Sequence, residues 1–97
     1  MAPLALAMPA AEAWPLIRRT IEAQPRARIV EATGEYLHAE YRSRLFRFVD
    51  DLELHLRPDQ RIIAVRSASR LGYSDFGVNR RRVETLCAGL SNLGVTR

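Results

Sequence analysis

The sequence of 97 residues has no lysine, one cysteine and two histidines. The single cysteine, Cys87, cannot form an intramolecular disulfide, and we find no zinc-binding spacing of cysteines and histidines. No apolar run approaches the roughly 20 residues that a membrane-spanning helix needs. Gly-rich phosphate loops and the motifs GxSxG and HExxH are also missing. We therefore expect no membrane span in this chain, no metal site and no cofactor, and we assign no catalytic residue.

The length fits one small domain, with 47% apolar and 27% charged residues. This composition excludes a disordered chain, a collagen-like repeat and a multi-domain enzyme. We expect an extended lead-in over residues 1–12, a single α+β domain over 13–92 and a tail over 93–97. The lead-in has no positively charged region before its short apolar run, so we expect no signal peptide and leave the compartment unassigned.

All of the positive charge comes from arginine, and the net charge is +4. One interpretation is GC-rich codon usage, which replaces lysine throughout a sequence. The other is functional, because arginine binds carboxylates and phosphates bidentately. The arginines are scattered among 11 acidic residues, and the aromatic residues occupy core-like positions, which disfavours a nucleic-acid partner.

Helical periodicity marks residues 11–24 and 78–90. In the first segment Trp14, Ile17 and Ile21 recur at helical spacing, and Pro25 ends it. Proline is typical of a first turn, so Pro15 predicts that the regular helix begins near Ala13. The second segment has an apolar stripe. It consists of Val83, Leu86, Cys87 and Leu90.

Four strands are predicted between these helices. They cover residues 28–32, 36–42, 46–56 and 62–70. The third alternates most clearly, with Leu52, Leu54 and Leu56 on one face and charged residues on the other. A hairpin loop over 57–60 joins it to the fourth. The order predicts a two-layer α+β fold, in which an N-terminal and a C-terminal helix pack on one face of a four-stranded antiparallel meander.

The hairpin loop predicts a register with Leu54 opposite Ile63 and Asp51 opposite Arg66. A similar turn before it places His38 opposite Asp51. The uncovered face then has a polar row. It comprises His38, Asp51 and Arg66, flanked by Glu40, Arg42, Glu53 and Arg70. The row is either a solvated set of ion pairs or a surface that binds a ligand or partner. His38 beside Asp51 also resembles an oriented general base.

A second polar cluster is predicted on the inner face of the sheet, where the second helix begins. It comprises Asp50, Ser67, Ser69, Asn79 and Arg80. A buried carboxylate needs a partner, and we expect Asp50 to pair with Arg80 or with backbone N–H groups at the start of the helix. The cluster would fasten the loop 72–77 to the sheet, with Asp75 as a helix N-cap or turn residue. Alternatively, or in addition, it forms an anion pocket at the helix N-terminus, rimmed by Arg70, Tyr73 and Arg80.

The strings FVDDLE (48–53) and IAVRSASRLGYSDFGVNR (63–80), with YLHAEY (36–41) and RVE (82–84), resemble the domain of unknown function 1499 family of bacterial and plastid proteins. The resemblance covers residues 13–90. It marks as motif positions Asp50, Asp51, Glu53, Arg66, Ser67, Ser69, Arg70, Gly72, Ser74, Asp75, Gly77, Asn79 and Arg80. The family pattern includes an earlier Pro-Asn and Cys-Val-Ser segment, which we expect this chain to lack. The resemblance implies relatives that are exported, membrane-tied or plastid-directed, and it supplies no reaction.

The leading hypothesis is a small non-enzymatic module that recognises an anionic ligand or an acidic partner surface through Arg66, Arg70 and Arg80. One alternative is a structural or interaction subunit of a membrane-associated assembly, and another is an enzyme that uses His38 and Asp51. A homodimer would be favoured by a flat, apolar outer sheet face. Its residues would be Tyr36, Ile62, Ala64 and Ala68.

Overall fold

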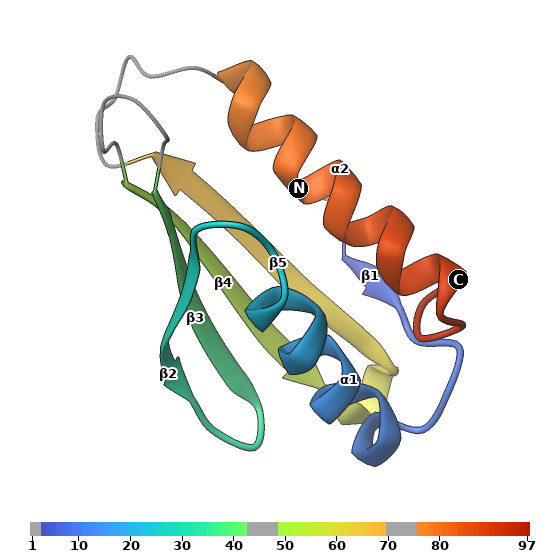
Figure 1. Cartoon of the computed structure of the whole chain (residues 1–97). Coiled ribbons are helices and arrows are strands. Elements are labelled where there is room, and N and C mark those ends of the chain that lie inside the picture. Colours follow the sequence, from blue (N-terminus) through green and yellow to red (C-terminus); the bar gives the residue numbers. More distant parts are fainter. Residues whose placement is uncertain (1–2, 43–48, 70–75) are drawn as a thin grey trace.

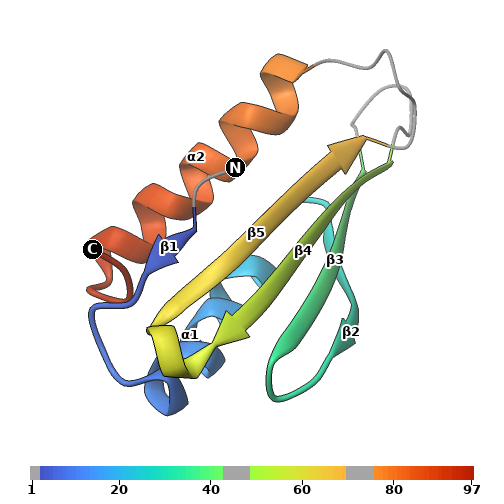
Figure 2. The same ribbon diagram turned by 180° about the vertical axis from the view of Figure 1, so that it is seen from behind.

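The computed structural model describes residues 3–42, 49–69 and 76–97, and only the backbone of residues 69 and 76–80. The elements, in chain order, are β1 (Leu4–Ala5), α1 (Ala10–Glu22), β2 (Ala27–Ala32), β3 (Tyr36–Arg42), β4 (Val49–Arg57), the 3-10 turn η1 (Pro58–Gln60), β5 (Ile62–Ser69) and α2 (Phe76–Asn92). The strands form one antiparallel sheet in the order β1-β5-β4-β3-β2. Both helices cover the same face, and the opposite face is uncovered (Figures 1 and 2).

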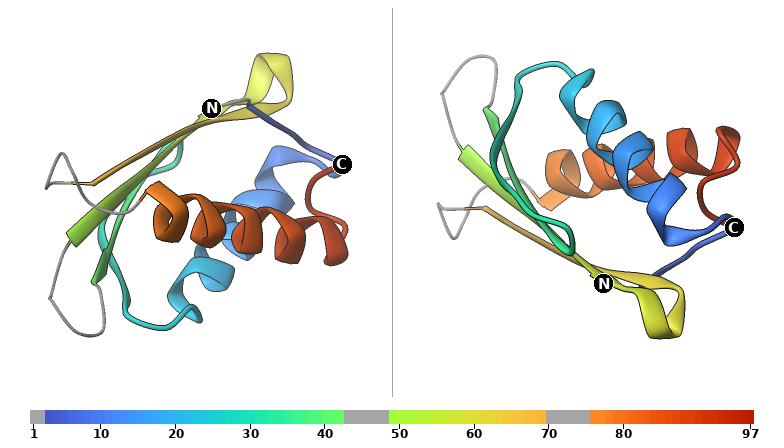
Figure 3. Two further views of the ribbon diagram at one scale, coloured as in Figure 1. Left: turned by 90° about the horizontal axis from the view of Figure 1, so that it is seen from above. Right: turned by 90° about the horizontal axis from the view of Figure 1, so that it is seen from below.

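The two-layer α+β fold is confirmed, and Figure 3 shows the helical layer on one side of the twisted sheet. The sheet has five strands instead of the four we predicted. The additional strand β1 pairs with the first residues of β5, with Leu4 opposite Ile63. Leu6 then forms a bridge to Thr96, and both Leu6 and Val95 are buried. Apolar side chains near both ends of the chain thus complete the core at the side of the sheet formed by β1 and β5.

Helix α1 begins at Ala10, directly after Pro9, so the predicted start near Ala13 was wrong. Pro15 lies inside the helix. It is tolerated because it is exposed, as is Ala11, whose carbonyl loses its helical partner and can bind water. In the described part of the chain, neither helix is long and apolar enough to cross a membrane.

The core follows the predicted alternation. Leu52, Leu54 and Leu56 of β4 are buried beneath the helices. The inner residues of β3 and most of the apolar stripe of each helix are buried with them, while Trp14 and Cys87 are partly buried. The buried residues are Ile17, Ile21, Leu37, Ala39, Tyr41, Val83, Leu86 and Leu90. Alternation along strands and periodicity along helices therefore selected the right faces.

The register between β4 and β5 differs from the prediction by two residues. Leu56 lies opposite Ile63, and the hairpin connection includes Arg61, which adopts a left-handed conformation with φ 54°. Nothing in the sequence predicts this conformation for an arginine, since glycine and asparagine favour it. A shift of two residues leaves every side chain on its face but changes its neighbour across the strands. Arg66 consequently lies opposite Glu53 instead of Asp51.

Candidate functional site

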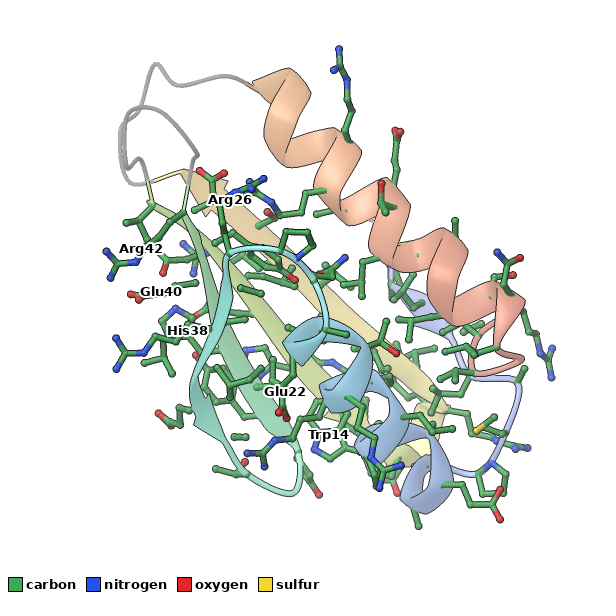
Figure 4. The ribbon with its side chains drawn as sticks, viewed as in Figure 1. Trp14, Glu22, Arg26, His38, Glu40 and Arg42 are labelled. Atoms are coloured by element: carbon green, nitrogen blue, oxygen red, sulfur yellow. The ribbon has the colours of Figure 1, made fainter. Side chains whose placement is uncertain are left out.

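The uncovered face of the sheet has a row of polar side chains from its three middle strands. His38, Glu40 and Arg42 succeed one another along β3 (Figure 4). Residues of all three strands line a hollow of about 220 Å³. They are His38, Asp51, Glu53, Arg66 and Ala68. The predicted outer row is therefore present, and its centre is concave.

His38 and Asp51 form the tightest pair in this hollow. The register places His38 directly opposite Glu53, which corrects the pairing that we predicted. The imidazole nevertheless reaches diagonally to Asp51, and His38 Nε2 lies 2.8 Å from Asp51 Oδ1. Since a carboxylate accepts hydrogen bonds, Nε2 is the protonated nitrogen in this contact. The carboxylate thus fixes both the tautomer and the orientation of the ring.

Glu53 joins two other side chains of the outer face. Its Oε1 accepts a hydrogen bond of 2.9 Å from the Tyr36 hydroxyl. Its Oε2 lies 3.7 Å from Nη1 of Arg66, whose side chain is 78% exposed. Partial burial and the neighbouring carboxylate of Glu53 raise the pKa of Tyr36 to about 12. Arg66 thus projects from the sheet, and among the described residues its ion pair is this long contact with Glu53.

Of the predicted inner polar cluster, the structure describes the side chains of Asp50 and Ser67, and it pairs Asp50 with Arg82, an arginine that we did not predict there. Arg82 Nη1 donates a hydrogen bond of 2.6 Å to Asp50 Oδ2, and the two side chains are 16% and 13% exposed. The Arg82 guanidinium carbon lies 4.7 Å from the centre of the Tyr41 ring. The Tyr41 hydroxyl donates in turn to Oε1 of Gln24, just after α1. The cluster thus links α2 to β4, β3 and the end of α1.

The sequence contained a signal for Arg82. It precedes Leu86 by four residues and so lies at the margin of the apolar stripe of α2. We predicted Arg80 instead, whose side chain lies outside the described residues, as do those of Ser69 and Asn79. Ser67 lines a small space together with Tyr41 and Arg82.

The predicted anion pocket at the start of α2 lies largely outside the described residues. The positions concerned are Arg70, Gly72, Tyr73, Ser74 and Asp75. Gly77 belongs to the first turn of α2. Among the described residues, no group of three or more His, Cys, Asp and Glu side chains could hold a metal ion.

A second hollow, of about 550 Å³, lies beside the β4–β5 connection, and sequence reasoning did not find it. The rings of Tyr36 and His55 meet there with their centres 4.8 Å apart. Its remaining lining includes both acidic and basic side chains. They belong to Glu35, Arg57 and Asp59. This mixture selects no single class of ligand.

The comparisons with known proteins bear on the family of the chain. No curated protein and no solved structure matches it. A family model matches residues 1–90, which is nearly the whole length, and its description is "Protein of unknown function (DUF1499)". The strings that resembled this family lie within the matched region, and their described residues belong to β3, β4, β5 and α2. The chain therefore belongs to the DUF1499 family of proteins of unknown function.

Proposed function

We propose that this domain is a small non-enzymatic binding module, which recognises a carboxylate or phosphate group of a ligand or partner on the uncovered face of its sheet. The observation that supports the proposal is the state of Arg66. Its side chain is 78% exposed at a polar hollow, and its nearest described carboxylate oxygen lies 3.7 Å away. A planar guanidinium in this state has donors available for a bidentate contact.

The two carboxylates in the hollow already have partners. Asp51 binds His38, and Glu53 accepts a hydrogen bond from Tyr36. Because each carboxylate accepts a hydrogen bond from another side chain, neither interacts with Arg66 alone. The exposed guanidinium of Arg66 projects beyond them. The net charge of +4 also attracts anions toward the domain. From the sequence pattern we also assign anion binding to Arg70, which flanks the row on the uncovered face, and to Arg80, which belongs to the anion pocket predicted at the start of α2.

The test is a titration of the isotope-labelled protein with inorganic phosphate and with citrate, followed by NMR. We expect saturable shifts of the amide signals of β4 and β5 around the hollow. Arg66→Gln should weaken binding about tenfold or more, because a hydrogen bond to a charged group contributes roughly 1.5–3 kcal/mol. Arg19→Gln removes the same charge from an exposed position on α1 and should bind as the wild type does. Equal binding by the two variants, or no saturable shifts with either anion, would refute the proposal.

The contact of 2.8 Å between His38 and Asp51 favours one alternative, an enzyme in which His38 acts as a general base. This alternative predicts turnover of an ester or phosphoester in a substrate screen, and its loss in His38→Gln. Turnover that persists unchanged in His38→Gln would remove this pair from any mechanism.

A further inference from the structure

Strand β2 forms one margin of the sheet, and in the described part of the chain no strand lies beyond it (Figure 2). Its sequence, Ala-Arg-Ile-Val-Glu-Ala over residues 27–32, has a distinctive symmetry. About the midpoint between Ile29 and Val30, apolar residues mirror apolar residues, and the basic Arg28 mirrors the acidic Glu31. Such a segment is complementary to a second copy of itself in antiparallel orientation.

A β-bulge in β2 places the two charged side chains on the same face of the sheet. Arg28 lies opposite Glu40, whereas Glu31 lies opposite His38, because the register shifts between Ile29 and Glu31. In a regular strand, residues three apart point to opposite faces. The bulge removes this offset, so that Arg28 and Glu31 both lie on the uncovered face.

The charged side chains of β2 and the apolar Val30 are exposed and available for contact with a partner. Within the part of the chain that the structure describes, neither Arg28 nor Glu31 forms a salt bridge, and both are exposed. Val30, at the bulge, is 48% exposed. It is one of two large hydrophobic side chains recorded as exposed among the described residues, and the other is Leu93 at 59%.

We propose that β2 pairs antiparallel with β2 of a second copy of this chain, about a twofold axis between Ile29 and Val30. Arg28 then lies opposite Glu31 of the partner subunit, and the symmetry forms this ion pair twice. Ala27 lies opposite Ala32 of the partner subunit, and Ile29 opposite Val30 of the partner subunit. Charge complementarity and the apolar centre thus select the same register.

A bulge and charged residues are devices that protect an edge strand from pairing with foreign strands. They do not exclude a second copy here, because the copy has the same bulge and the inverse order of charges. The pairing joins the two sheets into one and keeps their uncovered faces on the same side. The two hollows beside Arg66 would then be presented together, although the dimer does not depend on any role of Arg66.

The first measurement is sedimentation equilibrium of the full chain. A single strand pair is small beside the roughly 1,600 Å² of a standard interface, so we expect an association that depends strongly on concentration. The apparent mass should rise from 11.0 kDa toward twice this value as the concentration increases to about 1 mM. A mass that stays at 11.0 kDa over this range would overturn the proposal.

Charge reversal then locates the interface. Arg28→Glu makes the edge acidic, and Glu31→Arg makes it basic, so each variant alone opposes like charges across the strands. We expect each to self-associate at least tenfold more weakly than the wild type. An equimolar mixture should form a heterodimer at least as well as the wild type forms its dimer. A wild-type dimer that both variants keep, or a mixture that does not recover association, would overturn the proposal.

A second pair of variants keeps the test valid if a charge reversal impairs folding, which circular dichroism would reveal. Val30→Lys places a charge at the centre of the proposed contact and should abolish dimerisation. Leu93→Lys is the matched control, since Leu93 is the other exposed large hydrophobic side chain and lies just after α2. Equal loss of dimer in both variants, or in neither, would contradict an interface at β2.

Discussion

Removal of the Asp50 carboxylate is the sharpest test of the inner polar cluster. In Asp50→Ala the Arg82 guanidinium keeps its contact with the Tyr41 ring but loses its hydrogen bond of 2.6 Å, while its side chain is only 16% exposed. Breaking a buried ion pair by removing one partner costs roughly 3–5 kcal/mol. The residual exposure and the retained cation–π contact place the expected loss at the lower end, about 3 kcal/mol.

The outer ion pair supplies the comparison. Arg66 is 78% exposed, and its nitrogen lies 3.7 Å from Glu53, so Arg66→Ala should cost no more than about 0.5 kcal/mol. Urea unfolding, followed by circular dichroism and by the fluorescence of Trp14, measures both variants against the wild type. If the slope of the unfolding free energy against urea concentration is the same in all three proteins, the differences in midpoint report differences in stability.

Small and equal losses in Asp50→Ala and Arg66→Ala would refute the assignment of these residues to the inner and outer faces. A double variant, Asp50→Ala with Arg82→Met, provides the internal control. It removes the buried charge together with its partner, and so should recover most of the stability that Asp50→Ala loses. A double variant no more stable than Asp50→Ala would mean that the loss does not arise from an unpaired Arg82.

Three further predictions concern single residues. Burial raises the pKa of Tyr41 to about 12, so the tyrosine keeps its proton in the folded state after the unfolded chain has lost it. The stability contributed by Tyr41 should therefore fall by about 2 kcal/mol between pH 10 and 12, and the total fall measured by urea unfolding, to which Tyr36 also contributes, should be shallower in Tyr41→Phe. Gly94 has φ 76°, so Gly94→Ala should lower stability by about 1–2 kcal/mol in the same assay, and an unchanged midpoint would contradict this. Burial raises the pKa of the Cys87 thiol, so a disulfide reagent at pH 8 should label it more slowly in the native protein than in urea, and equal rates would show that the thiol is accessible.

The faces of the elements could be predicted from the sequence because they depend on local periodicity. Alternation in β4 placed Leu52 and Leu54 inside and Asp51 and Glu53 outside, as the structure has them. The register could not be predicted, since it depends on the left-handed conformation of Arg61, for which the chain offers no local signal. Strand β1 was not predicted either, because a strand of two residues is too short to show an alternating pattern.

For the candidate site too, the faces on which residues lie could be predicted, whereas the contacts between them could not. The sequence alone determined that His38, Asp51 and Arg66 share the uncovered face and that Asp50 is an inner carboxylate in need of a partner. Only the tertiary structure decided which side chains meet. It joined His38 to Asp51 across a diagonal, Arg66 to Glu53, and Asp50 to Arg82. Periodicity fixes the direction in which a side chain points, whereas its neighbour depends on strand register and on how α2 packs over the sheet, which only the folded chain as a whole sets.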